Sequence, residues 1–303
     1  MHAVEIDHVT KTFGTYAAVD DLSLAVPTGS IYGFIGPNGS GKTTTLRMIM
    51  RILHPNKGTI SVLGESGMGA ASDRVGYLPE ERGLYKQMKV RDVLRFYAEL
   101  KGMRRSGPAI DDWLSRLDLQ SWANKRVEAL SKGMSQKVQF IATVIHRPEL
   151  VLLDEPFSGL DPVNAEVLRE AVLELRRQGA TVIFSTHDMA MAEKLCDFIF
   201  MIYKGRKVLD GTLQEIRQNY GSDTLRLRLE GNGAALDDLP GVLRVSDFGH
   251  WKELRLQQGA DSQAVLAALL PRGRVSHFEL AQPSLQDIFV RIARPDTEES
   301  DHA

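Results

Sequence analysis

One segment of the sequence has the residue types and spacing of a loop that holds phosphate groups. Its glycines let the backbone fold closely around an anion, and the free N–H groups of the loop and of the next helix face that charge. Lys42 is placed to reach the β- and γ-phosphates of a nucleotide, and the Thr43 hydroxyl to ligate Mg²⁺. The pattern is GxxxxGK[ST]. The residues predicted to bind the nucleotide are Gly36, Pro37, Asn38, Gly39, Ser40, Gly41, Lys42, Thr43 and Thr44.

Two acids, Asp154 and Glu155, directly follow the aliphatic run 150–153. Such a run predicts a buried parallel strand, and ligands bind at the carboxyl ends of these strands. Asp154 is predicted to hold Mg²⁺, and Glu155 to accept a proton from the attacking water or to orient it. The alternative is a pair of solvated acids at a strand end, but the phosphate loop favours the catalytic interpretation.

Two further residues have both a structural and a chemical interpretation. His187 comes just after the apolar strand 181–185, from where it could reach the γ-phosphate, although a lone histidine is more often structural. Asp161 precedes Pro162, which is typical of a helix N-cap, so any functional role of Asp161 would be additional.

These residues need a sheet and helices to position them. Strands are expected within residues 2–35, and a helix over 43–52 follows the phosphate loop. Strands at 149–154 and 180–185 flank a helix that begins at Pro162, and a strand–helix–strand unit favours a parallel sheet. The segment of about 85–146 is predicted to form a helical subdomain.

The pattern changes after Gly221, so we predict a nucleotide-binding domain over 1–220 and a smaller domain over 221–293. Alternation in 225–229 indicates a half-buried strand. Short strands and two helices follow at 242–248, 251–257, 261–270, 274–281 and 284–292. This succession resembles a small α+β sandwich of the βαββαβ, ferredoxin-like kind. Residues 294–303 carry acids without core residues and are predicted to be a disordered tail.

Composition limits the function. The formal net charge of −2 provides no basic field for nucleic acid, and a single cysteine allows no disulfide within the chain. No stretch approaches the roughly 18–20 apolar residues that span a bilayer. If the chain works in transport, the pore is expected to come from another polypeptide.

Leu130-Ser131-Lys132-Gly133-Met134 lies shortly before the acidic strand. It resembles the LSGGQ signature, and with the motifs above it makes the chain resemble the ABC ATPases. The resemblance implies an α/β phosphate-loop cassette with antiparallel N-terminal strands, a parallel core sheet and a helical subdomain. It also implies ATP and Mg²⁺ as cofactors, and two cassettes packed head to tail, as a homodimer or a heterodimer.

The resemblance assigns roles to individual residues. Ser131 and Gly133 would bind the γ-phosphate held by the other subunit, and Asp161 would lie at the subunit interface. His187 would be the switch histidine, and Phe13 would stack on adenine.

The segments 77–84 and 283–289 are similar to a bacterial subgroup of sodium- and drug-exporter ATPases with a C-terminal extension. The implied function is an ATPase at the cytoplasmic face of the membrane that drives a separate permease and binds no nucleic acid. The alternative is a soluble ABC ATPase acting on a ribosome or a nucleic-acid complex. A single cassette with one cysteine and no long heptad run argues against that alternative.

The chain departs from the family pattern at three positions. The signature has Lys132 and Met134 where the family has Gly and Gln, and Glu80 replaces the usual Gln that senses Mg²⁺ and water. Glu80 is expected to ligate Mg²⁺, although it could instead face solvent or pair with Arg82. The segment from Glu80 to about Leu100 is where the resemblance places the permease, unless its hydrophobic residues belong to the helical core.

Overall fold

The computed structural model describes residues 1–66, 73–81, 83–220, 224–230, 236, 238–249, 251–257 and 259–293. The chain divides into two compact units, Met1–Thr212 and Leu213–Ala303. This division lies one helix before the boundary predicted after residue 220. Helix α7 (Leu213–Tyr220) groups with the second unit because Arg217 donates to the Pro283 carbonyl at 3.2 Å. The predicted tail, 294–303, lies outside the described residues.

The first unit is built on a six-stranded sheet whose order is β5-β6-β7-β3-β8-β9. Its strands are β3 (Ile31–Ile35), β5 (Val75–Leu78), β6 (Leu150–Asp154), β7 (Thr181–Thr186), β8 (Phe198–Tyr203) and β9 (Arg206–Gly211). All neighbours pair in parallel except β8 and β9. The central strands β3, β6 and β7 are buried along their whole length, which explains their continuous aliphatic runs. The predicted parallel core sheet is confirmed.

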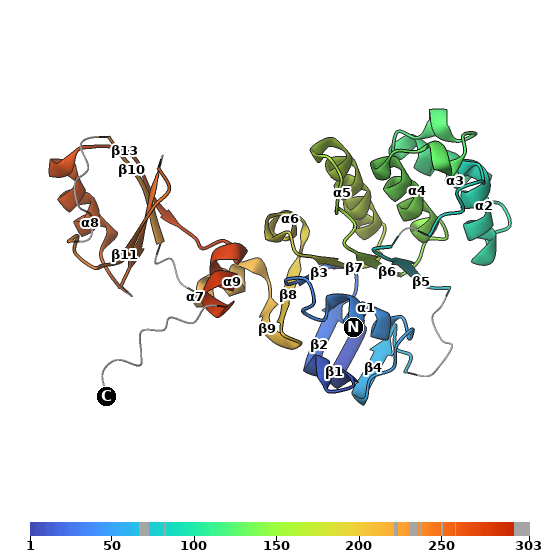
Figure 1. Cartoon of the computed structure of the whole chain (residues 1–303), viewed down its shortest axis with the longest axis horizontal. Coiled ribbons are helices and arrows are strands. Elements are labelled where there is room, and N and C mark those ends of the chain that lie inside the picture. Colours follow the sequence, from blue (N-terminus) through green and yellow to red (C-terminus); the bar gives the residue numbers. More distant parts are fainter. Residues whose placement is uncertain are drawn as a thin grey trace. The chain divides into compact units, whose positions relative to one another are not determined.

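A second sheet is separated from the first by helix α1 (Lys42–Ile49), which packs against both sheets. It is antiparallel, in the order β2 (Tyr16–Pro27), β1 (His2–Phe13) and β4 (Lys57–Val62). Helix α1 contacts strands of both sheets and lies between them (Figure 1). Leu46, Met48 and Ile49 bury its apolar face in the shared core. The antiparallel N-terminal strands are therefore confirmed.

Helices cover the other face of the core sheet (Figure 1). The expected helical subdomain is formed by α2 (Val90–Leu100), α3 (Gly107–Arg116) and α4 (Lys132–Val144), with 3₁₀ turns η1 (Gln120–Trp122) and η2 (Val127–Ala129). Helices α5 (Pro162–Arg177) and α6 (Met189–Leu195) follow the core strands β6 and β7. Trp113 and Phe140 meet edge to face at 5.9 Å and join α3 to α4. Over the described parts of the chain, no helix has the length and apolar character needed to cross a membrane.

The second unit is α+β, as expected, and its strands and helices lie at the expected ranges. Its sheet is antiparallel throughout, in the order β11-β12-β10-β13. The elements after α7 are β10 (Thr224–Glu230), β11 (Val242–Asp247), β12 (Lys252–Leu256), α8 (Ser262–Leu269), η3 (Leu270–Arg272), β13 (Arg274–Ala281) and α9 (Leu285–Ala293). The described elements run strand, strand, strand, helix, strand, helix, so the last element is helix α9 and not a strand as in βαββαβ; most residues between β10 and β11 lie outside the described ranges. Leu225, Leu227 and Leu254 pack with Val265 and Leu269 of α8 in its core.

Candidate nucleotide-binding site

The phosphate loop joins the buried strand β3 to helix α1, in the context that its motif requires. Gly41, the residue before α1, has φ 112°, a backbone conformation that is unfavourable for residues other than glycine. A Cβ at Gly41 would also lie 2.5 Å from the carbonyl oxygen of Ala18. The glycine is therefore fixed both by the turn and by the close approach of strand β2.

Lys42 is buried within this loop and close to the acidic strand end. Its Nζ donates to the carbonyl oxygens of Gly36 at 2.7 Å and Pro37 at 3.2 Å, and lies 3.6 Å from Glu155 Oε1. Burial lowers the pKa of Lys42, while Glu155 and Asp154 act in the opposite direction. The ammonium group thus lies between the loop backbone and a carboxylate that partly compensates its burial.

The buried carboxylate of Asp154 is held by two hydroxyl groups. Thr43 donates to its Oδ1 at 3.1 Å, and Ser185 donates to the same oxygen at 2.5 Å. The Ser185 hydroxyl also accepts the backbone N–H of Glu155 at 3.0 Å. Sequence reasoning assigned no role to Ser185. It is a hydroxyl at the end of a neighbouring strand, paired in register with Asp154, and that pairing was not visible in the sequence.

Glu155 and His187 form a pair. His187 Nδ1 lies 3.0 Å from both carboxylate oxygens of Glu155. Glu155 is buried and has φ 49°, an uncommon conformation for a residue other than glycine. Backbone strain of this kind is typical of functional sites, where the surrounding structure holds a side chain in one direction. The His187 side chain is largely exposed, so the pair connects a buried carboxylate to solvent.

A cavity of about 290 Å³ opens beside the loop. Phe13, Glu80 and Glu155 line it together with residues of the loop and its helix, from Asn38 to Thr44. Tyr16 lines it too, although sequence reasoning had not identified this residue, and its O–H donates to the Gly39 carbonyl at 3.2 Å. The exposed fractions of Phe13 and Tyr16 are 50% and 57%, so both rings are available to a ligand.

Three other predicted residues lie at helix starts and do not line this cavity. Ser131 caps α4 by accepting the Met134 N–H, and Asp161 caps α5 by accepting the N–H groups of Val163 and Asn164. A Cβ on Gly133 would lie 3.4 Å from the Asn164 amide nitrogen, so the starts of the two helices are neighbours. The capping interaction of Asp161 agrees with the structural role expected of it, and Ser131 caps its helix in the same way.

Comparisons with known proteins identify the family of this chain. Residues 19–158 match the family described as ABC transporter, and residues 211–293 match the DrrA1-3-like ATP-binding protein C-terminal domain. The chain is 45% identical over 287 residues to the ABC transporter ATP-binding protein YhaQ of Bacillus subtilis (strain 168), across 94% of this chain and 96% of YhaQ. It is 31% identical over 296 residues to Nod factor export ATP-binding protein I of Burkholderia lata, across 95% and 96% of the two chains. A solved ATP-binding subunit of an ABC transporter shares the fold with a TM-score of 0.68 and 30% identity, across 72% of this chain and 93% of that one. The chain therefore belongs to the ABC transporter ATP-binding proteins, a family that hydrolyses ATP to drive transport.

Proposed function

We propose that this chain hydrolyses MgATP at the site around Lys42 and Glu155 and thereby drives an exporter permease at the cytoplasmic face of the membrane. The observation that carries the proposal is the meeting of three pairs at one edge of the core sheet. Lys42 contacts the loop carbonyls and lies close to Glu155. Thr43 donates to Asp154, and His187 contacts Glu155, the next residue along the chain.

The loop residues bind and orient the nucleotide. Lys42 neutralises charge on the β- and γ-phosphates, and the N–H groups at the start of α1 face the same oxygens. Phe13 and Tyr16 provide exposed rings at the cavity, on which an adenine can stack. The cavity thus offers a cationic end for phosphates and an aromatic end for a base.

The oxygen groups at the cavity fit Mg²⁺. Among the described residues, no group of three or more His, Cys, Asp or Glu side chains forms a metal site by itself. Nucleotide-associated Mg²⁺ does not need such a group, because it takes one or two carboxylates together with phosphate oxygens and water. Asp154 and Thr43 would hold the ion, and Glu80, at the cavity wall, would supply a further oxygen. Bound there, Mg²⁺ would supply positive charge against the phosphate groups of the nucleotide.

Glu155 acts as the carboxylate that orients the attacking water and accepts its proton. The largely exposed His187 contacts both carboxylate oxygens of Glu155, and Lys42 Nζ lies 3.6 Å from one of them. The buried backbone of Glu155 is fixed by Ser185. The position of Glu155 is therefore set by contacts of both its side chain and its backbone.

The signature residues would act on the nucleotide of a second cassette. Ser131 and Gly133 lie at the start of α4, where free N–H groups and a hydroxyl can bind an anion, yet they do not line the cavity of their own chain. A head-to-tail dimer would place them over the partner's γ-phosphate, with Asp161 at the interface. The partner is a second copy of this chain or a different cassette.

The permease would dock beside Glu80, where a second cavity of about 410 Å³ is lined by Pro79, Leu84, Tyr97 and Leu100. Leu84, Met88 and Tyr97 are partly buried against the helical core, as the alternative interpretation of this segment expects. Tyr85 and Leu100 are 53% and 63% exposed, so an apolar surface remains for a partner. Export is favoured by the similarity to Nod factor export ATP-binding protein I.

ATP binding by Lys42→Ala tests the phosphate-loop assignment. The purified variant is expected to bind MgATP at least about a hundredfold more weakly than wild type, because two or more charge-assisted contacts are lost. The exposed Lys57 on β4 provides a matched control, and Lys57→Ala is expected to bind normally. Equal affinities of Lys42→Ala and Lys57→Ala would reject the assignment.

A further inference from the structure

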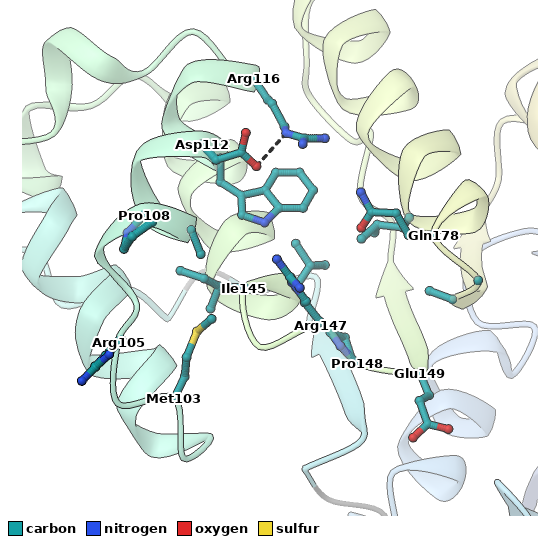
Figure 2. A pocket seen from close by; sticks show the side chains of 16 residues that line it. Met103, Arg105, Pro108, Asp112, Arg116, Ile145, Arg147, Pro148, Glu149 and Gln178 are labelled. Carbon is teal, nitrogen blue, oxygen red and sulfur yellow. Dashed lines mark hydrogen bonds and ion pairs between the residues drawn. The ribbon is translucent and has the colours of Figure 1, made fainter.

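A large hollow in the first unit lies away from the nucleotide cavity and shares no lining residue with it. It has a volume of about 750 Å³ and lies between α3 and the C-terminal ends of α4 and α5. Figure 2 shows side chains from these elements converging on one groove. Its size lies within the roughly 300–1,000 Å³ typical of sites for small organic ligands.

The floor of this groove is apolar. Trp113 of α3, Ile145 after α4 and Leu175 of α5 are buried beneath it, and Met103 and Pro108 extend the apolar lining toward the rim. An aromatic ring or a short hydrocarbon chain placed on this floor would be removed from water on one side.

Not all of the arginine side chains that line the groove are paired with an acid. Asp112 is paired with Arg116 at 2.9 Å, and Glu149 with Arg74 at 2.7 Å. Arg105 and Arg147 are both exposed, and neither guanidinium group has an ion-pair or hydrogen-bond partner within the described part of the chain. The acidic lining residues are therefore neutralised, while two positive charges remain available.

Of these two cations, Arg147 is better placed to bind a ligand. Figure 2 shows its side chain rising into the groove next to Ile145, whereas Arg105 lies at the rim and points outward. The backbone of Arg147 has φ 56°, and its N–H donates to the Val144 carbonyl at 2.9 Å. Pro148 follows and restricts the chain further. This turn fixes the position from which the Arg147 side chain enters the groove.

We propose that this groove is a binding site for a small amphipathic organic anion. The apolar part of the ligand lies on the floor formed by Trp113, Ile145 and Leu175, and its carboxylate or sulfonate group pairs with Arg147. An uncharged ligand fits less well, because it would strip water from the guanidinium group without providing an acceptor. Such a ligand would touch the helical subdomain through α3 and the core through α5 at the same time.

The site can be tested with anilinonaphthalene sulfonate and with phenylnaphthylamine, which has the same ring system without the sulfonate. The full-length protein is first saturated with MgADP, so that the nucleotide cavity is not available to either dye. Dye fluorescence is then titrated for wild type and variants. Wild type is expected to bind the sulfonate dye saturably and more tightly than the uncharged dye.

Two matched arginine variants identify the cation. Arg147→Gln is expected to weaken binding of the sulfonate dye by about fivefold to tenfold, the value of one charge-assisted contact at a partly exposed site, and to leave the uncharged dye unaffected. Arg104 is exposed and adjacent to Arg105 but does not line the groove, so Arg104→Gln is expected to change neither dye. Ala109→Phe, which fills the groove from α3 without altering charge, should weaken both dyes.

The proposal is overturned by equal effects of Arg147→Gln and Arg104→Gln, by equal wild-type affinity for the two dyes, or by undiminished binding to Ala109→Phe. Circular dichroism melts of each variant separate a lost site from lost folding. ATP binding, measured on nucleotide-free portions of the same protein preparations, distinguishes a failure of this site from a failure of the nucleotide-site assignment.

Discussion

Ser185→Ala tests how the catalytic edge of the sheet is held together. The hydroxyl of Ser185 is fully buried, donates to Asp154 Oδ1 at 2.5 Å and accepts the Glu155 N–H at 3.0 Å. Removing it takes one of two hydroxyl donors from a buried carboxylate and leaves a buried N–H without its acceptor. Both losses occur at the residues proposed to hold Mg²⁺ and to orient water.

The expected cost follows from these two contacts. A hydrogen bond to a charged group contributes roughly 1.5–3 kcal/mol, and an unsatisfied buried donor costs roughly 1–3 kcal/mol. Thr43 still donates to Asp154 in the variant, which offsets part of the first loss. We therefore expect the free energy of unfolding to fall by about 2–4 kcal/mol. Turnover should fall by about tenfold or more, because the Glu155 carboxylate loses part of its fixed orientation.

The assay is urea unfolding followed by circular dichroism, together with phosphate release from MgATP. The other end of the same strand provides a matched control, since buried Thr181 accepts the Gly29 N–H at 2.9 Å. Thr181→Val is expected to cost about 1 kcal/mol and to leave turnover unchanged. The reasoning is refuted if Ser185→Ala loses less than about 0.5 kcal/mol, within the range of an ordinary surface substitution, or turns over as fast as Thr181→Val.

Three other variants test separate parts of the account. Glu80→Gln should raise the Mg²⁺ concentration needed for half-maximal ATPase activity, and an unaltered Mg²⁺ titration would leave Glu80 as a surface acid. Lys86 is exposed next to Tyr85, so Lys86→Glu should reduce permease-stimulated ATPase activity more than basal activity, whereas equal loss of both would favour a purely structural segment. Burial, with a smaller contribution from the charge of Lys101, lowers the pKa of His146 from 6.5 to about 4. The imidazole of His146 is therefore harder to protonate in the folded state than in the unfolded state. Because the unfolded state binds this proton first, stability should fall by about 1–2 kcal/mol between pH 6.5 and pH 4, after allowance for solvent screening. His146→Phe should flatten this part of the pH–stability curve, and an unchanged slope would contradict the assignment.

The parts of the site that are local in sequence could be predicted from it. The phosphate loop and the acids after strand β6 each occupy one short segment, and the pattern of glycines or aliphatics around them fixes their surroundings. Ser185 could not be predicted in the same way, because its role depends on the register that pairs it with Asp154 across two strands. Tyr16 reaches the loop from a different sheet, so nothing in its own segment indicates the contact with Gly39.

The domain boundary and the strand pairing of the second unit were harder to predict for a related reason. The composition changes at Gly221, but α7 before it is tied to the second unit by contacts with residues much later in the chain, such as Pro283. The α+β character of that unit follows from its alternating strands. The order of strands in its sheet depends on which strands pair, and alternation alone does not determine strand pairing.

The most direct test of the central claim is a parallel measurement of ATP affinity and phosphate release for Glu155→Gln. The amide keeps the size of the side chain but cannot accept a proton. Our account predicts an ATP dissociation constant within about threefold of wild type and turnover reduced by roughly 10²–10⁴, the usual contribution of a positioned base. Glu99→Gln, at an exposed position on α2, provides the control and should behave as wild type. Turnover by Glu155→Gln close to that of Glu99→Gln would show that Glu155 is not the carboxylate that activates water.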